Sequence, residues 1–391
     1  MAVAYRAARV FDGVSEQAVE NGAVVVEDGR IASVGEARAL PPGVEVVDLG
    51  NVTLLPGLID AHVHLVWSAS AEPHEVVERE SRALTTLRCA ANAALHLGAG
   101  VTSVRDVGAT DGLSIDIARA VELGVISGPR VVAAGRAIAM TGGHGWFIGR
   151  EADGVEAVRH AVRSELKAGA ECIKLMASGG VYGHAEEPGS PQLTVEELRA
   201  GVAEAHKAGR KVAAHAYSAE AINNALSAGV DSIEHGSFLD RATAERMREQ
   251  GTYLVPTLSV YQAMSDRGPE LGSPDYIQRK TAEVLMASRE AFRLALETGV
   301  PLAAGTDCGA PGHPHGTLPE ELRVMVDAGA TPLEALRYGP SAAAVVLGLA
   351  EEVGTLEPGK KADLLAVGGD PLRDVGALRD VRLVLRDGSE V

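Results

Sequence analysis

The segment Leu-Leu-Pro-Gly-Leu-Ile-Asp-Ala-His-Val-His, residues 54–64, brings an apolar run directly into a His-Xaa-His pair. We expect Gly57–Leu65 to form a buried strand, because the run is short, apolar and introduced by Pro-Gly. Successive side chains of a strand point to opposite faces, so His62 and His64 would share one face near its end. The pair alone is common by chance, and its meaning depends on what the rest of the chain places beside it.

Apolar runs and helical stretches alternate through the middle of the chain. Several helical stretches stop at a glycine that leads into the next run, as at Gly169, Gly209 and Gly299, which is typical of a helix C-cap before a strand. Such repeated units imply parallel strands joined by helical crossovers. Eight of them over about 250 residues predict a (β/α)8 TIM barrel, of the α/β class.

A doubly wound parallel sheet is the alternative fold. No Gly-Xaa-Gly-Xaa-Xaa-Gly motif follows the first strand, so a dinucleotide site has no support. The expected strands are Gly57–Leu65, Val101–Val107, Val131–Ala137, Cys172–Ala177, Val212–Ala216, Ser232–His235, Tyr253–Pro256 and Leu302–Gly305. The expected helices include Val76–Leu97, Gly154–Ala168, Thr194–Ala208 and Ala282–Glu297.

Both ends of the chain differ from this middle, because they read as short strands separated by turns. The strands expected there are Ala23–Val26, Ile31–Val34, Val44–Leu49, Val52–Leu55, Asp363–Val367 and Val381–Leu385. A Glu-Asp-Gly-Arg turn signal separates the first two of them. We therefore expect residues 1–55 and 350–391 to build one small β-sandwich domain beside a barrel domain of residues 56–349.

Composition narrows the class of protein. The 391 residues include 36 Lys plus Arg and 53 Asp plus Glu, for a net charge of −17, and 46% are hydrophobic. Strong acidity argues against nucleic acid or an anionic membrane as a partner, because phosphate binding needs clustered cations. The three cysteines, Cys89, Cys172 and Cys308, are far apart and predict no disulfide framework. With no signal peptide and no long apolar stretch, we expect a cytoplasmic protein.

Polar residues that can bind metal or move protons stand near the ends of the expected strands. After His62 and His64 on the first strand come Lys174 on the fourth, His215 on the fifth, His235 on the sixth and Asp307 after the eighth. Each alone has a plain structural explanation, such as a hydrogen-bonded histidine or an aspartate at a turn. Together they would meet at the carboxyl-terminal mouth of one barrel, where active sites of this fold lie. Four imidazoles and a carboxylate suit a divalent ion such as zinc.

Lys174 is the most informative of these residues, because it lies between Ile173 and Leu175. A bare ammonium buried there is costly, and a salt bridge inside the barrel is one solution. The other is that the neutral amine captures carbon dioxide. The resulting carbamate is an anionic, bidentate oxygen ligand that can bridge two metal ions.

These residues resemble the amidohydrolase superfamily, in its two-metal form with a carboxylated lysine. The segment at residues 54–64 and the final Gly-Thr-Leu-Glu-Pro-Gly-Lys-Lys-Ala-Asp-Leu are typical of it. Within it, the chain is similar to the prolidase-like branch that hydrolyses Xaa-Pro and Xaa-Arg or Xaa-Lys dipeptides. That likeness rests on residues 140–145, 173–181, 214–217 and 230–236. Two loops depart from the pattern, the proline-rich His313–Glu320 and Arg337–Pro340.

The resemblance implies a role for each residue. It assigns His62, His64 and Asp307 to one ion and His215 and His235 to the other, with carboxylated Lys174 bridging them. Two zinc ions would activate a shared hydroxide, which attacks an amide of a dipeptide or N-acyl amino acid. Asp307 would take the hydroxide proton and pass it to the leaving amine. The resemblance also implies a homo-oligomer with a small-molecule substrate.

Four further residues are candidates for substrate contact. His144 lies between glycines after the third strand, and Tyr217 points to the same side as His215. Both can hold the oxyanion or the substrate carboxylate and are catalytic candidates. Arg105 and Arg136, at the ends of the second and third strands, are cationic reserves, although each can instead pair with a neighbour such as Asp106.

The other histidines are set apart from this site. We expect His74, His96, His160 and His206 on helix surfaces, whereas His184, His313 and His315 lie in loops that could reach the site.

Other functions on the same framework remain open. A deaminase would carry a Glu three residues after His215, where this chain has Ser218. A non-catalytic scaffold would be expected to have lost ligands, whereas all six positions are filled. A lactonase, esterase, phosphotriesterase, or arylamide or carbamate hydrolase could use the same metal pair, because fold and site do not fix the substrate.

Overall fold

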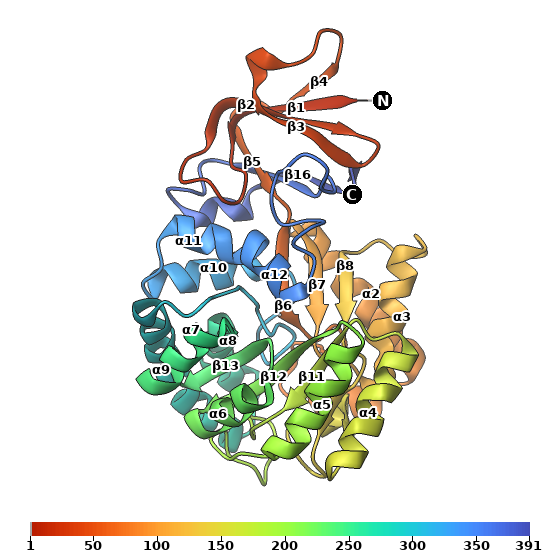
Figure 1. Ribbon diagram of the computed structural model, residues 1–391, viewed down its shortest axis with the longest axis vertical. Coiled ribbons are helices and arrows are strands. Elements are labelled where there is room, and N and C mark those ends of the chain that lie inside the picture. The colour runs from red at the N-terminus through yellow and green to blue at the C-terminus, as the bar shows by residue number, and fades with distance from the viewer. Residues whose placement is uncertain (1) are drawn as a thin grey trace.

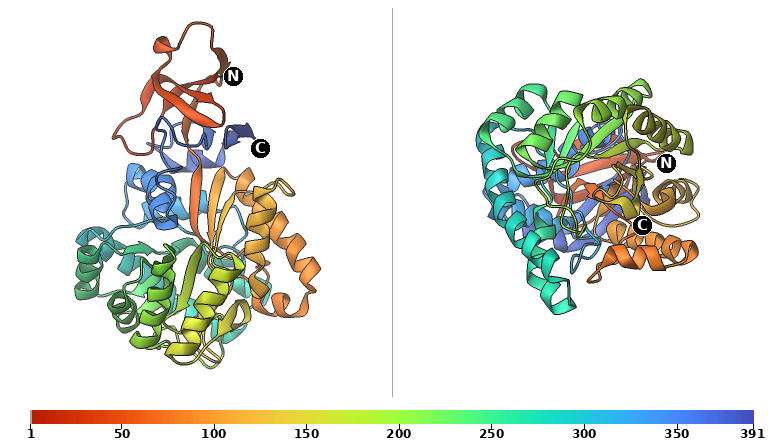
Figure 2. Two further views of the ribbon diagram at one scale, coloured as in Figure 1. Left: turned by 45° about the vertical axis from the view of Figure 1, so that its right-hand side comes forward. Right: turned by 90° about the horizontal axis from the view of Figure 1, so that it is seen from below.

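The computed structural model describes residues 2–391 (Figure 1). An upper part made mostly of strands contains both chain ends, and a larger lower part has strands surrounded by helices. Seen from below, the helices form an outer ring around the strands (Figure 2). The protein is therefore of the α/β class, and strands from both chain ends lie in the same part of the molecule.

The upper part is a single mixed sheet of eight strands. Its order is β17-β16-β15-β5-β1-β2-β3, with β4 also pairing β1, so strands from both chain ends are hydrogen-bonded neighbours. The central junction is the antiparallel pairing of β5 with β15, in which Leu55 lies opposite Leu365. The strands are β1 (Val3–Val10), β2 (Val19–Glu27), β3 (Arg30–Glu36), β4 (Glu45–Asp48), β5 (Val52–Pro56), β15 (Leu364–Gly368), β16 (Val381–Arg386) and β17 (Ser389–Glu390).

The lower part contains two parallel sheets. One has the order β6-β7-β8 and the other the order β10-β9-β11-β12-β13-β14, and every neighbouring pair in them is parallel. The strands are β6 (Leu58–Val63), β7 (Val101–Asp106), β8 (Arg130–Ala133), β9 (Ala137–Ala139), β10 (Gly149–Glu151), β11 (Cys172–Met176), β12 (Lys211–Ser218), β13 (Ser232–Phe238) and β14 (Tyr253–Val255). All carboxyl-terminal strand ends in each sheet therefore point the same way.

Two of the expected strands need correction. The run Val131–Ala137 is divided between β8 and β9, because the chain turns at Gly135, whose φ of 72° suits glycine. The run Leu302–Gly305 forms no regular strand. Leu302 makes an isolated bridge to Leu254, and just beyond the run Cys308 makes one to Val63. The 302–308 segment still lies between the edges of the two sheets, since Ala61 N–H donates to the Ala304 carbonyl at 3.0 Å.

Helices pack on the outside of the parallel sheets. They are α1 (Pro73–Arg79), α2 (Arg82–Gly98), α3 (Leu113–Glu122), α4 (Val155–Ala168), α5 (Val195–Lys207), α6 (Ala219–Ala228), α7 (Arg241–Gln250), α8 (Leu258–Leu271), α9 (Asp275–Thr298), α10 (Leu318–Asp327), α11 (Pro332–Arg337) and α12 (Ala343–Leu347). The expected helix Val76–Leu97 is two helices, because the Ser81 hydroxyl caps a new start by accepting from Leu84 N–H. Glycines in the left-handed conformation end α4 and α9, as predicted at Gly169 and Gly299.

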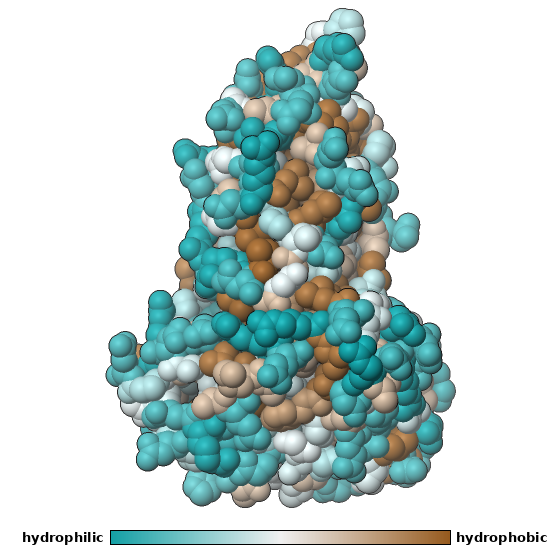
Figure 3. Space-filling view, turned by 90° about the vertical axis from the view of Figure 1, so that its left-hand side faces the viewer, coloured by the Kyte–Doolittle hydropathy of each residue, from teal (hydrophilic) through white to brown (hydrophobic). Residues whose placement is uncertain are grey.

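Two hydrophobic cores stabilise the two parts. A small core joins Val24, Leu54, Leu364 and Leu385 across the upper sheet, and a larger one fills the space between the parallel strands and their helices. From the side, hydrophilic side chains cover much of the surface, and apolar ones gather in a central strip that runs from the upper to the lower part (Figure 3). Across residues 2–391, no helix is long and apolar enough to cross a membrane.

Candidate metal centre

All six residues predicted as metal ligands line one cavity. His62 and His64 come from the end of β6, and Asp307 comes from the 302–308 segment between the two sheets. Lys174, His215 and His235 come from β11, β12 and β13. The strand alternation that put these side chains on one face of each strand therefore also brings them together in space.

His62 and His64 each have one ring nitrogen committed to a hydrogen bond. His62 Nδ1 lies 2.7 Å from the Glu234 carboxylate, and His64 Nδ1 lies 2.8 Å from the Gly108 carbonyl. Because these oxygens accept, each Nδ1 carries the proton and each Nε2 presents a lone pair. Both Nε2 atoms lie 3.6 Å from Asp307 Oδ1. Both rings thus lie near one Asp307 oxygen, and the donor atoms of His62, His235 and Asp307 lie within 4.8 Å of one another.

His215 and His235 are oriented in the same manner. His215 Nε2 donates to the Gly179 carbonyl at 3.0 Å, which leaves Nδ1 as the free nitrogen. His235 Nδ1 lies 2.8 Å from Thr257 Oγ1 and 2.9 Å from the Tyr261 hydroxyl, which leaves Nε2 free. Hydrogen bonds of this kind, on the nitrogen away from the metal, fix the ring orientation of ligating histidines.

The remaining two predicted ligands have atoms without partners. Lys174 Nζ and Asp307 Oδ1 are both buried, and neither makes a hydrogen bond to a described residue. An unsatisfied buried polar atom is costly, so such atoms mark places where a ligand is expected. Neutral imidazoles, a carboxylate and a carbamate are donors that zinc accepts, so the residues fit a pair of divalent ions.

Burial sets the protonation of this cluster. It lowers the pKa of His62, His64, His215 and His235, so the imidazoles are neutral and able to bind metal. Burial also lowers the pKa of the Lys174 amine and raises that of the Asp307 carboxyl. A neutral amine is the form of lysine that reacts with carbon dioxide, which agrees with the predicted carbamate.

A second layer of buried polar residues supports the ligands from below, and the sequence analysis missed it. Glu234 accepts from both His62 and Arg105, and Arg105 also donates to the Ala61 carbonyl and to Ser232. Asp60 accepts from the Thr306 hydroxyl and from the backbone N–H of His62. Both carboxylates stand beside or two residues from a predicted ligand, and that proximity was the available signal.

The structure brings two of the four substrate candidates to the cavity. His144 and Tyr217 line it. Arg105 does not reach it, because its guanidinium is fully buried in the layer below, paired with Glu234 rather than Asp106. Arg136 lies outside the cavity and pairs with Glu165 at 3.0 Å. The expectation that these two arginines serve as cationic reserves is therefore wrong.

His144 is held by its neighbours. Its Nδ1 donates to Glu186 Oε1 at 2.9 Å, and its ring stacks on His215 with centroids 4.3 Å apart. Burial alone would raise the pKa of Glu186, but His144 and backbone N–H groups hold it below the usual value, so the carboxylate is anionic. A Cβ at residue 180 would lie 2.1 Å from the His144 ring, so only glycine fits at Gly180.

Apolar and aromatic side chains form the rest of the wall. They are Trp67, Phe147, Met176, Val181, Tyr182, Tyr261 and Met264. Trp67 packs against His64 with ring centroids 4.4 Å apart, and Tyr182 stacks near His144. Sequence reasoning assigned none of them to the site: Met176 ends β11, but the others come from loops, a short 3-10 turn and α8 rather than from strand ends.

The other histidines are more varied than expected. His160 and His206 are exposed on helices, as predicted, and His74 is half-buried against Phe147 and Tyr182. His96 is fully buried, so its assignment to a helix surface is wrong. His313 and His315 are buried but do not line the metal-binding cavity, and His184 is exposed beside Tyr276.

Comparison with known proteins identifies the family. The family model described as the amidohydrolase family matches residues 53–391, so this chain belongs to the amidohydrolase family. The chain is 32% identical to the ochratoxinase of Aspergillus niger over 403 aligned residues, which cover 94% of this chain and 81% of that protein. It is therefore a hydrolase of the amide-cleaving kind.

Solved structures agree closely with this fold. A Xaa-Pro dipeptidase with bound methionine in its active site superposes with a TM-score of 0.93 at 32% identity, covering 100% of both chains. A prolidase complexed with N-methylphosphonate-L-proline gives a TM-score of 0.93 at 35% identity, covering 100% of this chain and 99% of that one. These likenesses bear out the resemblance to prolidase-like amidohydrolases inferred from the motifs.

Proposed function

We propose that this chain hydrolyses the amide bond of a dipeptide or N-acyl amino acid, in the manner of an Xaa-Pro dipeptidase. The observation that carries the proposal is the arrangement of the cavity. Four neutral imidazoles present their free nitrogens beside two unpartnered atoms, Lys174 Nζ and Asp307 Oδ1.

In this proposal, His62, His64 and Asp307 hold one divalent ion, and His215 and His235 hold a second. Lys174 joins them as its carbamate, and zinc is the ion that the donors suit. When bound, such ions make a water acidic and polarise the scissile carbonyl.

Asp307 is the residue that moves protons. Its Oδ1 faces the cavity without a hydrogen-bond donor, and burial raises the pKa of its carboxyl. A raised pKa brings a carboxylate closer to the range in which it can accept a proton from the attacking water and return it. We propose that Oδ1 delivers that proton to the leaving nitrogen.

Tyr217 supplies a proton donor for the developing oxyanion. His235 Nδ1 donates toward the hydroxyls of Thr257 and Tyr261, and the Tyr261 hydroxyl lies 2.7 Å from that of Tyr217. With His235 donating, Tyr261 can donate to Tyr217, which leaves the Tyr217 proton free for substrate. Burial raises the pKa of Tyr217, so its hydroxyl stays protonated.

His144 binds the substrate carboxylate. Its Nδ1 proton is bonded to anionic Glu186, so Nε2 is the nitrogen available to a ligand. Of the basic side chains among residues 2–391, only Lys174 joins the histidines in lining the cavity, so no arginine is available for this task. The His144 ring, held by Glu186, and the Tyr217 hydroxyl are therefore the polar groups that a carboxylate would meet.

The wall chemistry supports a substrate with an apolar ring. Trp67, Phe147 and Tyr182 offer flat apolar faces next to the ligands, and Met176 and Met264 adapt to irregular shapes. The enclosed volume is about 20 Å³, room for one water molecule. A dipeptide therefore needs the covering segments 141–148 and 178–192 to move apart before it binds.

The relatives support the same substrate class. Among the similar proteins are a Xaa-Pro dipeptidase, a prolidase and an ochratoxinase. The first two names describe dipeptide hydrolases, and their structures superpose on the whole of this chain.

We also propose the domain organisation that this function needs. Residues 56–349 would form one closed (β/α)8 barrel and residues 1–55 with 350–391 one β-sandwich. In support, the 302–308 segment hydrogen-bonds to both sheets, and Glu171 N–H donates to the Ala133 carbonyl at 2.8 Å across the other gap. The small core shared by both chain ends supports the second domain.

An activity screen of the zinc-loaded protein tests the function. The library contains Xaa-Pro, Xaa-Arg and Xaa-Lys dipeptides and N-acyl amino acids, each paired with its carboxamide. We expect hydrolysis of at least one free acid, and a kcat/KM about tenfold or more lower for its amide, the size of one charge-assisted hydrogen bond. No hydrolysis of any member would contradict the proposal.

A neutral substrate is the second candidate, and one observation favours it. The cavity wall is apolar, and the two predicted arginines are absent from it. Equal rates on free and amidated substrates would indicate a neutral ester, lactone, arylamide or carbamate instead. We further propose that the enzyme acts on its small-molecule substrate in the cytoplasm. We also propose that it is a homo-oligomer, and light scattering of the purified protein tests its oligomeric state.

A further inference from the structure

A second cluster of metal-binding side chains lies behind the first site. His96 from α2 and Cys308 and His315 from the loop before α10 bring three donor atoms together. His96 Nε2 and His315 Nδ1 are 3.1 Å apart, and Cys308 Sγ lies 3.4 Å from the first and 3.2 Å from the second. All three residues are buried, with exposed fractions of 0%, 0% and 8% for His96, Cys308 and His315.

We propose that His96, Cys308 and His315 bind a third metal ion, a zinc held by one thiolate and two imidazoles. Ligand atoms around a tetrahedral zinc lie about 3.3–3.8 Å apart, given Zn–N near 2.0–2.1 Å and Zn–S near 2.3 Å. The three observed distances are within or slightly below that range. A small movement of the ligands away from one another would therefore accommodate the ion. Three protein donors leave the fourth position for a water molecule.

The protonation of His315 supports ligation. Its Nε2 lies 3.1 Å from the Trp67 carbonyl, which can only accept, so the proton is on Nε2. His315 Nδ1 is therefore a bare lone pair directed at Cys308 and His96. This is the arrangement of a ligating histidine whose other nitrogen is held by a backbone carbonyl.

Hydrogen bonding alone leaves His96 unsatisfied. If its Nε2 donates to His315, its Nδ1 is a buried acceptor, and no described residue donates to it. If the proton is on Nδ1, the nearest acceptor is Asp60 Oδ2 at 4.0 Å, beyond a hydrogen bond. With an ion on Nε2, the Nδ1 proton faces the Asp60 carboxylate, which is the electrostatic partner that metal-bound histidines commonly have.

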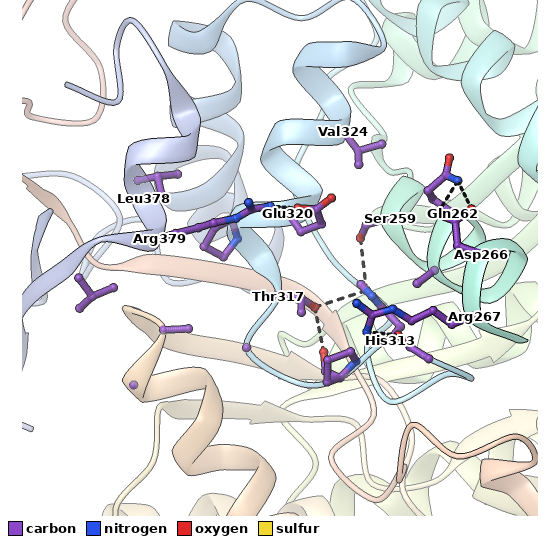
Figure 4. Close-up of a pocket in the computed structure, with 18 of the residues that line it drawn as sticks. Ser259, Gln262, Asp266, Arg267, His313, Thr317, Glu320, Val324, Leu378 and Arg379 are labelled. Carbon is purple, nitrogen blue, oxygen red and sulfur yellow. Dashed lines mark hydrogen bonds and ion pairs between the residues drawn. The ribbon is translucent and has the colours of Figure 1, made fainter. Parts of the chain in front are cut away.

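A pocket beside the cluster is the route that we propose for the ion. This pocket of about 620 Å³ lies between α8, α10 and the 375–379 turn, and part of its wall is formed by Gly98, Ala99, Gly312, His313, Pro314, Gly316 and Thr317. Figure 4 shows His313 of that wall joined by dashed lines to Ser259 and Thr317, with Arg267 beside it. The wall thus contains the end of the helix that carries His96 and the loop that carries His315. Binding would release the thiol proton to solvent.

Sulfur ligation separates this site from the first one. The six predicted ligands of the strand-end cavity offer only nitrogen and oxygen, whereas the third site has a thiolate. We therefore expect X-ray absorption of the zinc-loaded wild-type protein to show a sulfur neighbour at about 2.3 Å. After exchange for cobalt, the protein should show a near-ultraviolet thiolate-to-cobalt charge-transfer band.

Variants then assign the signal. Cys308→Ser and His96→Asn should each lose one metal ion per chain and the cobalt band, while the strand-end ions remain. Cys89→Ser is the matched control, because Cys89 is a buried cysteine on the same helix as His96, outside the cluster. It should keep three ions and the band.

The wild-type spectrum decides the proposal even if a variant fails to fold. Absence of a sulfur neighbour, or a cobalt band that survives Cys308→Ser, would overturn it. Because the test detects sulfur and not turnover, a protein that shows the sulfur signal but hydrolyses no dipeptide or N-acyl amino acid would refute the proposed substrate class and leave the third site supported.

Discussion

Two layers of buried polar side chains lie inside the lower part of the molecule, and they differ in whether their atoms have partners. In the cavity layer, Lys174 Nζ and Asp307 Oδ1 have none. In the layer beneath, each of the three guanidinium nitrogens of Arg105 donates a hydrogen bond, to Ala61, Ser232 and Glu234 respectively. The difference separates two atoms that can still bind a ligand from a hydrogen-bonded network that positions the side chains around them.

The largest effect should come from removing a cavity-layer ligand. Lys174→Ala should lose bound metal and lower kcat by more than the roughly 10–100-fold that loss of an outer hydrogen-bond partner costs. Short carboxylates such as formate or acetate should restore part of the rate, because they can stand in as bridging oxygens. Metal analysis and steady-state kinetics measure both, and Lys211→Ala, an exposed lysine on β12, is the control. Full activity of Lys174→Ala without additives would refute its bridging role.

A substitution in the layer beneath the cavity should lower the stability of the fold. Arg105→Met leaves the Glu234 carboxylate buried beside an apolar side chain, so we expect the free energy of unfolding to fall by about 3–5 kcal/mol. Chemical denaturation of the metal-free protein measures this. Arg82→Met removes an exposed ion pair with Asp116 and should change stability by less than about 1 kcal/mol. Equal losses in the two variants would show that the buried network is not special.

Glu234 connects the layers, so its variant should show an intermediate effect. Glu234→Gln keeps the size of the side chain but removes the charge that holds the proton on His62 Nδ1. We expect metal affinity to fall by about 10–100-fold, measured by competition with a chromophoric chelator. Unchanged affinity would mean that His62 needs no outer partner.

The smallest effects are expected at the substrate side. Tyr217→Phe and His144→Asn should each lower kcat/KM by about tenfold while leaving the metal content intact. Tyr261→Phe should weaken the same hydrogen bond indirectly, so its effect and that of Tyr217→Phe should not add in the double variant. Additive losses in the double variant would contradict this, because they would show that Tyr261 does not act through Tyr217.

The cavity layer was predictable from sequence because periodicity decides it. Alternation places His62 and His64 on one face, and parallel strands put their carboxyl ends at one edge. Tyr261 was not predictable, because α8 reaches the site only through tertiary packing. Leu302–Gly305 looked like a strand from its apolar run, yet only isolated bridges form.

His96 shows a misread signal. Cys89, Asn92, Ala93 and His96 follow an i, i+3, i+4, i+7 spacing and share the buried face of α2. That spacing was visible in the sequence and argues for a buried histidine rather than a surface one. The prediction that Arg105 contacts substrate was wrong for another reason. Arg105 precedes the strand end at Asp106, and its side chain points into the layer beneath the cavity.

Crystallography of the zinc-loaded protein with anomalous data tests the central claim most directly. We expect two anomalous peaks about 3.5–4 Å apart, enclosed by His62, His64, Lys174, His215, His235 and Asp307. Density for three extra atoms should extend from Lys174 Nζ. A single peak or none in that cavity, with an unmodified lysine at full zinc loading, would contradict the account.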